Sequence, residues 1–125
     1  MSLDIYKEII LDHYKNPHNF GSLDTLHKAQ VANPLCGDAI TIELEISNNA
    51  VSDIRFNGQG CAIAIASASL LTDFARNKSI ADLTTLNKDS MLEILAVELS
   101  PNRLKCALVS LEALHKAIKT YGSNT

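Results

Sequence analysis

The chain has 125 residues, of which 46% are hydrophobic and 20% charged, and its formal net charge at pH 7 is −3. This balance is typical of a folded globular domain and excludes intrinsic disorder. Scattered Lys and Arg, an aromatic content of 5% and the absence of Trp argue against a nucleic-acid-binding surface. The sequence shows neither an apolar run long enough to cross a membrane nor a secretory signal. We therefore expect one soluble, cytoplasmic domain over residues 1–125 that binds neither nucleic acid nor membrane.

The chain opens with a predicted helix and a loop. Apolar residues three and four positions apart predict a helix over residues 3–14, which ends at Asn16-Pro17. A loop follows, and a weak signal places a short strand over residues 27–32.

Two strands are predicted next. Apolar and polar residues alternate strictly over residues 39–47, which predicts a strand with one buried and one wet face. Glu43 and Glu45 lie on the face expected to be solvated. Asn48-Asn49 is a turn signal, after which a second strand is predicted over residues 51–56.

The second half of the chain has helical periodicity. Helices are predicted over residues 61–77, 80–86, 89–99 and 103–121, and Ser100-Pro101-Asn102 is interpreted as a break before the last one. Because the strands precede these helices instead of alternating with them, the predicted class is α+β. We expect a small antiparallel sheet with helices packed on one face.

The three cysteines, Cys36, Cys61 and Cys106, are the residues most able to carry chemistry. An odd number cannot pair completely, and disulfides are rare in cytosolic proteins. Reduced cysteine is among the most buried residue types, so inert thiols in an interaction domain are one hypothesis. Each cysteine, however, lies at a junction between predicted elements.

The surroundings of the cysteines favour a shared metal site. Cys36 lies in a loop bracketed by proline and glycine, and Asp38 follows closely enough for its carboxylate to converge with the thiol. Cys61 follows a Gly-x-Gly loop and opens a predicted helix. Cys106 is placed in the first turn of the last helix. Helix N-termini favour thiolates, so both thiols are expected to be stabilised as anions.

Three thiolates and one carboxylate form a ligand set that suits Zn²⁺, Cu(I) or an iron–sulfur cluster. With Zn²⁺ bound, a net charge of about −2 remains, which Arg103 and Lys105, close to Cys106 in the sequence, are placed to offset. Asp38 is the only oxygen donor, so it is expected to be the ligand that exchanges.

Several segments resemble the U-type iron–sulfur cluster assembly proteins, which include IscU, SufU and the N-terminal domain of NifU. They are YKEIILDHYKNPHNFG (6–21), NPLCGD (33–38), FNGQGCAIAIASASLLTD (56–73) and RLKCALVSLEAL (103–114). The resemblance extends over about residues 3–118 and implies a SufE/NifU-like fold.

The chain combines features of two branches of that family. Gly60-Cys61-Ala62-Ile63 and the segment around Cys106 are similar to the SufU branch. Lys105 stands where IscU-type scaffolds carry His, and Leu99-Ser100-Pro101-Asn102-Arg103 stands where they carry a Leu-Pro-Pro-Val-Lys chaperone-docking motif. The insertion usual in SufU proteins between the second and third cysteines is absent, so the length is similar to that of IscU.

The resemblance implies that Cys36, Asp38, Cys61 and Cys106 hold Zn²⁺ in a SufU-like protein or a transient [2Fe–2S] cluster in an IscU-like one. It also implies that the protein accepts persulfide sulfur from a SufS-like or IscS-like cysteine desulfurase and passes sulfur or a nascent cluster to apo iron–sulfur proteins. Cys36, in a loop expected to swing outward, is the predicted acceptor, with Cys106 as the alternative. Zinc-dependent sulfurtransferase activity, non-enzymatic scaffolding and a small adaptor with purely structural zinc all stay open.

The histidines are given structural roles. His13, His18, His27 and His115 are expected to be surface residues or hydrogen-bonded core residues. His115 lies about 13 Å beyond Cys106 along the last predicted helix, too far to share its site.

Overall fold

The structure, a computed structural model, describes residues 2–34 and 37–123. Its elements in chain order are α1 (Ser2–Lys15), β1 (His27–Asn33), β2 (Asp38–Ser47), β3 (Ala50–Gln59), α2 (Ala62–Ala75), α3 (Ile80–Thr84), α4 (Lys88–Leu95) and α5 (Pro101–Ser123). Every predicted element is present. The strands are longer than predicted, and α2, α3 and α4 are shorter.

Within the described residues, the strands form a three-stranded antiparallel sheet in the order β1-β2-β3. Ile42 on the central strand pairs with Ala29 on one side and Phe56 on the other. Asn48 and Asn49 close the β2–β3 hairpin with φ angles of 54° and 61°, the left-handed conformation that a type I′ turn needs. The predicted α+β class is confirmed.

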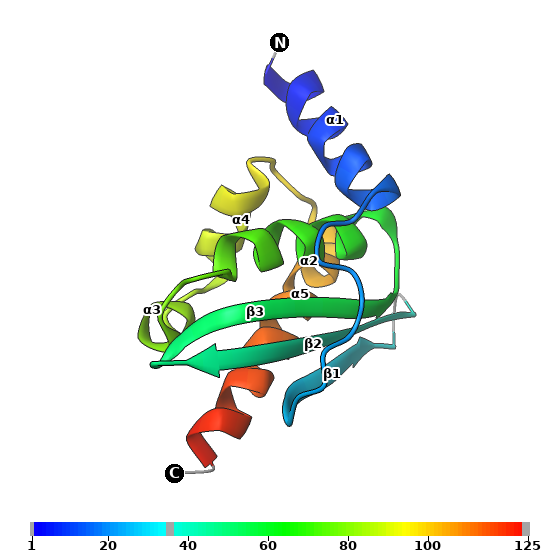
Figure 1. The fold of residues 1–125 in the computed structure, drawn as a ribbon. Coiled ribbons are helices and arrows are strands. Elements are labelled where there is room, and N and C mark those ends of the chain that lie inside the picture. The colour runs from blue at the N-terminus through cyan, green and yellow to red at the C-terminus, as the bar shows by residue number, and fades with distance from the viewer. Residues whose placement is uncertain (1, 35–36, 124–125) are drawn as a thin grey trace.

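The helices α2 and α5 cover one face of this sheet (Figure 1): α5 packs against β1 and β2, and α2 against β3. The main core fills the space between them, and Ile40, Ile42 and Leu44 of β2 are completely buried in it. These are the residues that the alternating pattern assigned to the inner face. Helix α1 packs on α2, and its N-terminal half projects from the body of the molecule.

Glu43 departs from the prediction of a solvated strand face. Glu45 is exposed as expected, but Glu43 is only 6% exposed. The loop between α1 and β1 crosses this face of the sheet (Figure 1), and the Leu23 N–H donates to Glu43 Oε1 at 2.7 Å. Asn57 Nδ2 donates to Oε2 at 2.9 Å. The expectation for Glu43 is therefore wrong, because the loop supplies partners that replace water around the carboxylate.

The start of α5 also differs from the prediction. Pro101 is its first residue, a position where the fixed φ of proline and its missing N–H fit the helix. The Ser100 hydroxyl accepts the Arg103 N–H at 3.4 Å, and the Ser100 carbonyl accepts the Leu104 N–H at 2.8 Å. The segment interpreted as a break is therefore the beginning of the helix.

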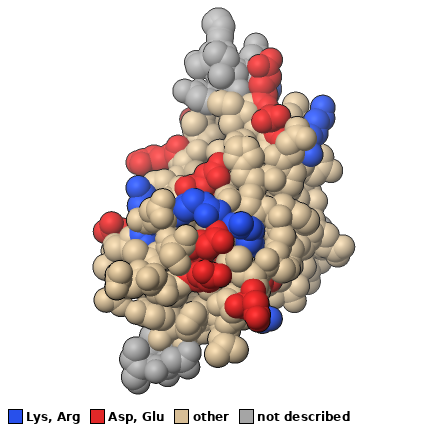
Figure 2. Space-filling model, in the orientation of Figure 1, with Lys and Arg blue, Asp and Glu red and all other residues tan. Residues whose placement is uncertain are grey.

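Acidic and basic side chains lie interspersed on the face of the molecule shown in Figure 2. Ion pairs within the described residues include Asp53 with Arg55 at 2.5 Å and Asp53 with Arg76 at 2.8 Å. Among the helices of the described part of the chain, none has the length and apolar character needed to cross a membrane.

Candidate metal centre

Asp38, Cys61 and Cys106 come together from segments that are far apart in the sequence. Asp38 begins β2, Cys61 immediately precedes α2, and Cys106 lies within α5. One carboxylate oxygen of Asp38 and the two Sγ atoms all lie within 4.8 Å of one another. Three donors at this spacing can hold one metal ion. Cys36, the fourth predicted ligand, lies outside the described residues.

Asp38 is the most deeply buried of these three residues, with 1% of the residue exposed. Its Oδ1 accepts the backbone N–H of Cys61 at 2.9 Å, and its Oδ2 lies 4.0 Å from the Cys61 Sγ. The carboxylate therefore binds the N–H of the residue that caps α2 and also faces the thiol of that residue. Burial of a carboxylate is costly unless such donors are present.

Two glycines shape the backbone around Asp38. Gly37 has a φ of +72°, the left-handed conformation expected for its turn, and its N–H donates to the Asn33 carbonyl at 2.9 Å. A Cβ at Gly60 would lie 2.8 Å from Asp38 Oδ1 and 2.9 Å from the Cβ of Ala64, closer than real side chains approach. Glycine at position 60 thus lets the Cys61 N–H reach the carboxylate.

The two described thiols differ in their surroundings. Cys61 is exposed and is the N-cap residue of α2, so the positive end of the α2 dipole lies beside it as predicted. Cys106 is 6% exposed and lies in the second turn of α5. The prediction that Cys106 lies in the first turn and gains from a helix N-terminus is wrong, because α5 begins at Pro101.

The two basic residues beside Cys106 are both exposed and border different hollows. Lys105 lines a hollow of about 270 Å³ together with Asn33 and Pro34, which precede Cys36 closely in the sequence. Arg103 lines a different hollow, a groove that shares no lining residue with the first. That either cation offsets charge at the metal centre stays a prediction.

The groove has a volume of about 520 Å³ and starts next to Cys61, since Ala62 and Ile63 form part of its wall. Helix α1 and the segment before α5 supply the other walls. The apolar lining residues are Ile10, Leu11, Ala62, Ile63, Val97 and Leu99. An apolar hollow thus lies beside Cys61, the exposed one of the three described donors of the candidate metal centre.

The donor set fits a thiophilic ion. Zinc–sulfur and zinc–oxygen bonds put two donors of a tetrahedral site about 3.3 to 3.8 Å apart, so small side-chain adjustments from the observed spacing are enough. Thiolate sulfur with one carboxylate suits Zn²⁺ or the iron of an iron–sulfur cluster. Three donors from the described residues leave a fourth position, and Cys36 precedes Asp38 by two residues in the sequence.

Sequence reasoning did not find a second group of metal-ligating side chains. The His13 and His18 rings have centroids 4.4 Å apart, and His18 Nδ1 lies 2.6 Å from Asp73 Oδ2. Taken singly, each histidine is a surface residue or a hydrogen-bonded buried residue, as predicted. The convergence of His13 and His18 with Asp73 was not predicted. His27 Nδ1 is hydrogen-bonded to a threonine hydroxyl, and His115 Nε2 donates to a backbone carbonyl away from the cysteines.

Comparisons with known proteins agree on one family. A family model described as the NifU-like N terminal domain matches residues 5–125. The iron–sulfur cluster assembly scaffold protein IscU of Aquifex aeolicus is 40% identical over 119 residues, which cover 93% of this chain and 75% of that protein. The zinc-dependent sulfurtransferase SufU of Bacillus subtilis is 33% identical over 138 residues, which cover 96% of this chain and 94% of that protein.

A solved structure shows the same fold. The crystal structure of the N-terminal part of a nitrogen-fixing NifU-like protein from Brucella abortus gives a TM-score of 0.79 at 20% sequence identity, covering 98% of this chain and 97% of that chain. At this identity the likeness is one of fold alone.

Proposed function

The chain belongs to the NifU-like N-terminal domain family, and on this premise we propose that it is an iron–sulfur cluster assembly protein that accepts persulfide sulfur. It then passes on sulfur or a nascent cluster. The observation that carries this proposal is the convergence of the Asp38 carboxylate and the Cys61 and Cys106 thiols to within 4.8 Å of one another.

The proposed ligands of a Zn²⁺ ion are Cys36, Asp38, Cys61 and Cys106. Bound zinc would keep the thiols deprotonated until a sulfur donor arrives. Asp38 is the single oxygen donor, and its Oδ1 is already engaged by the Cys61 N–H, so it is the ligand we expect to leave first. The same side chains suit a [2Fe–2S] cluster as cargo.

Sulfur transfer is an exchange at a persulfide. A thiolate of this chain attacks the outer sulfur of the donor's persulfide, the S–S bond of the donor breaks, and the donor leaves as a thiolate. No net oxidation or reduction occurs. Cys36 is the proposed acceptor. Burial weighs against Cys106, since its residue is 6% exposed, and Cys61 is held to Asp38 through its backbone N–H.

The proposed sulfur donor is a cysteine desulfurase of the SufS or IscS type, and the proposed recipients are apo iron–sulfur proteins. The groove beside Cys61 offers a partner an apolar surface next to the metal centre. Ile9, Leu11 and Tyr14 on α1 add apolar side chains that are 40%, 49% and 43% exposed. Contiguous exposed apolar surface of this kind marks sites of protein–protein interaction.

The test mixes the zinc-bound protein with a cysteine desulfurase and cysteine for a single turnover, followed by mass spectrometry of the cysteine-containing peptides. We expect one added sulfur on the Cys36 peptide and its loss in Cys36→Ser. Cys61→Ser and Cys106→Ser, checked for folding by circular dichroism, report the other two thiols. Sulfur found mainly on Cys106 would reverse the assignment of the acceptor.

A structural zinc adaptor would behave differently. It would bind about one zinc per chain through the same cysteines and acquire no sulfur from any desulfurase. The exposure of Cys61 and the carboxylate ligand disfavour this alternative, because structural zinc sites are closed and mostly built from cysteine and histidine. One bound zinc per chain, with no persulfide formed on any cysteine, would nevertheless show that the protein is such a structural zinc adaptor.

A further inference from the structure

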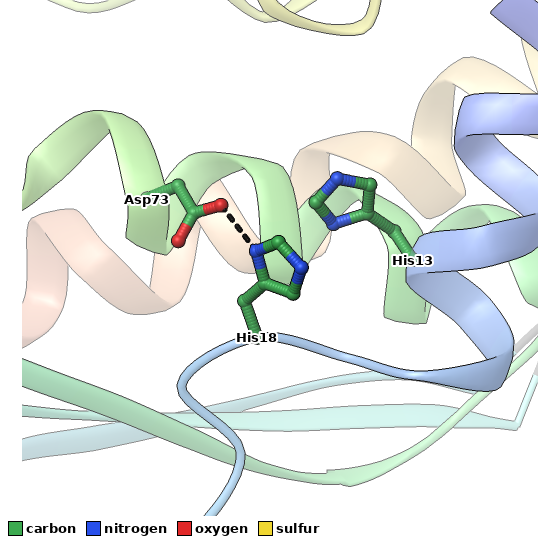
Figure 3. Close-up of side chains that lie close together, drawn as sticks. All are labelled: His13, His18 and Asp73. Carbon is green, nitrogen blue, oxygen red and sulfur yellow. Dashed lines mark hydrogen bonds and ion pairs between the residues drawn. The ribbon is translucent and has the colours of Figure 1, made fainter.

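His13, His18 and Asp73 form a second cluster of metal-ligating side chains (Figure 3). His13 lies in the last turn of α1, His18 in the loop that follows, and Asp73 near the end of α2. One nitrogen of each imidazole and one oxygen of the carboxylate all lie within 4.8 Å of one another. Helix α1, its following loop and α2 thus meet at one point on the surface.

Hydrogen bonds already orient these side chains. His13 Nδ1 is 2.6 Å from the buried Ser69 hydroxyl, and that hydroxyl also accepts the His18 N–H at 2.8 Å. Asn19 Nδ2 donates to Asp73 Oδ1 at 2.8 Å, while His18 Nδ1 contacts Oδ2. Such outer contacts are characteristic of metal sites, where they fix the ring and carboxylate orientations.

The electrostatics favour neutral imidazole at His13. Burial, and to a smaller extent the neighbouring His18, lowers the pKa of His13 below its ordinary value of 6.5. A metal ion binds the neutral form of histidine.

A serine-type catalytic triad does not fit the same residues. Ser69 is completely buried and cannot reach a substrate. The carboxylate contacts His18, whereas the serine hydroxyl contacts the Nδ1 of His13, so no one imidazole connects the acid to the hydroxyl in the order that a triad requires.

We propose that His13, His18 and Asp73 form a second metal site, which takes a divalent first-row transition-metal ion such as Zn²⁺ or Fe²⁺. Two imidazoles and one carboxylate are a donor set that suits these ions and leaves coordination positions open to water. Nitrogen and oxygen donors on one such ion are about 3.3 Å apart, so the widest pair must close by up to about 1.5 Å. The side chains of His18 and Asp73 are 49% and 43% exposed and can rotate without repacking the core.

This second site is separate from the candidate metal centre of Asp38, Cys61 and Cys106. Cys61 caps the N-terminus of α2, and Asp73 lies twelve residues later in the same helix. This separation corresponds to about 18 Å along the helix axis. Its donors contain no sulfur, so the bound ion should exchange readily. Because it bridges α1 and α2, occupancy should also stabilise the packing of α1.

The test begins with protein whose thiolate centre is filled by one equivalent of Zn²⁺, to which Co²⁺ is then added. We expect weak visible absorption from a nitrogen–oxygen Co²⁺ site, without the near-ultraviolet charge-transfer band of cobalt bound to thiolate. Imidazole resonances of His13 and His18 should broaden in NMR spectra. His18→Gln and Asp73→Asn should each weaken this binding at least about tenfold.

His27→Gln is the matched control, since His27 lies on β1 and contacts Thr120 and Tyr121. It should bind the second ion like the parent protein. Gln at position 18 can still donate to Asp73, so an unchanged melting temperature with lost binding separates a metal ligand from a structural residue. Unchanged binding in both site variants would overturn the proposal, as would a thiolate band or unaffected histidine resonances in the parent protein. If a variant fails to fold, the NMR result for the parent protein decides the test.

Discussion

The carboxylate of Asp38 has two roles that substitution can separate. It accepts the Cys61 N–H at 2.9 Å, and it supplies negative charge within 4.8 Å of two thiols. The first role is structural, since it fixes the start of α2 through a partly buried hydrogen bond. The second belongs to the metal centre. An amide retains the first role and lacks the second.

Asp38→Asn should therefore fold with a stability close to that of the parent and bind zinc more weakly. Asp38→Ala should lose both roles and cost about 1 to 3 kcal/mol in the free energy of unfolding, because the Cys61 N–H loses its acceptor. Urea unfolding measures stability, and competition with a chelator measures zinc affinity. Equal zinc affinity in Asp38→Asn and the parent would show that the carboxylate is not a ligand.

At the level of elements, the loop between α1 and β1 is held to the sheet by Glu43. The side chain accepts from Leu23 and Asn57 and is 6% exposed. Residue alternation correctly placed Glu43 on the outer face of β2 but did not predict its burial. Its partner Leu23 lies twenty residues away in a loop without periodicity, so a local pattern could not reveal the contact.

Glu43→Ala should release this loop and cost about 1 to 3 kcal/mol, because two donors lose their buried acceptor. Glu43→Gln keeps an acceptor for Leu23 and should cost less. Urea unfolding gives the stabilities, and hydrogen exchange should show loss of protection at the Leu23 amide in the alanine variant only. Glu45→Ala, an exposed carboxylate on the same strand, should change stability by no more than about 0.5 kcal/mol.

Asp53 connects β3 to the end of α2 and gives the fold a dependence on acid pH. Burial alone would raise its pKa, but hydrogen bonds from Arg76 and the Ile54 N–H, with the charge of Arg55, hold the pKa below 3.8. At pH values between the lowered pKa of Asp53 and its ordinary pKa, the folded chain therefore binds fewer protons than the unfolded chain. The stabilising contribution of Asp53 is complete above its ordinary pKa and is lost as the pH falls through the lowered pKa.

Asp53→Asn should remove this contribution. Between about pH 6 and about pH 3, the free energy of unfolding should fall less in Asp53→Asn than in the parent, as measured by urea unfolding at each pH. Glu45→Gln controls for the loss of one carboxylate. A fall as steep in Asp53→Asn as in the parent would show that Asp53 does not carry the effect.

At the scale of the whole molecule, sequence patterns succeeded where structure is local. The strand over residues 39–47 and the Asn48-Asn49 turn were readable because alternation and left-handed turn residues act over a few positions. Cys106 was misplaced by a helical turn because Pro101 was interpreted as a break. The His13, His18 and Asp73 cluster was missed because Asp73 lies 55 residues after His18 and no pattern relates the two.

The cysteines and Asp38 were identified as one candidate site, mainly through the family resemblance, since their spacing matches no short ligand motif. The structure brings together Asp38, Cys61 and Cys106, and Cys36 lies outside the described residues. A site assembled from distant segments depends on the fold, which the sequence indicates only indirectly.

Because the candidate metal centre brings together residues of β2, α5 and the start of α2, a bound metal ion should contribute to the stability of the whole fold. Removal of zinc with a chelator should lower the free energy of unfolding by about 4 kcal/mol relative to protein with free zinc near 1,000 times its Kd. Hydrogen exchange should speed up in the first turns of α2 and α5 and change little in the paired centre of the sheet. In Cys106→Ser, the same chelator should shift the melting temperature much less. An unchanged melting temperature in the parent, with its zinc shown to be removed, would mean that the centre binds metal without tying these elements together.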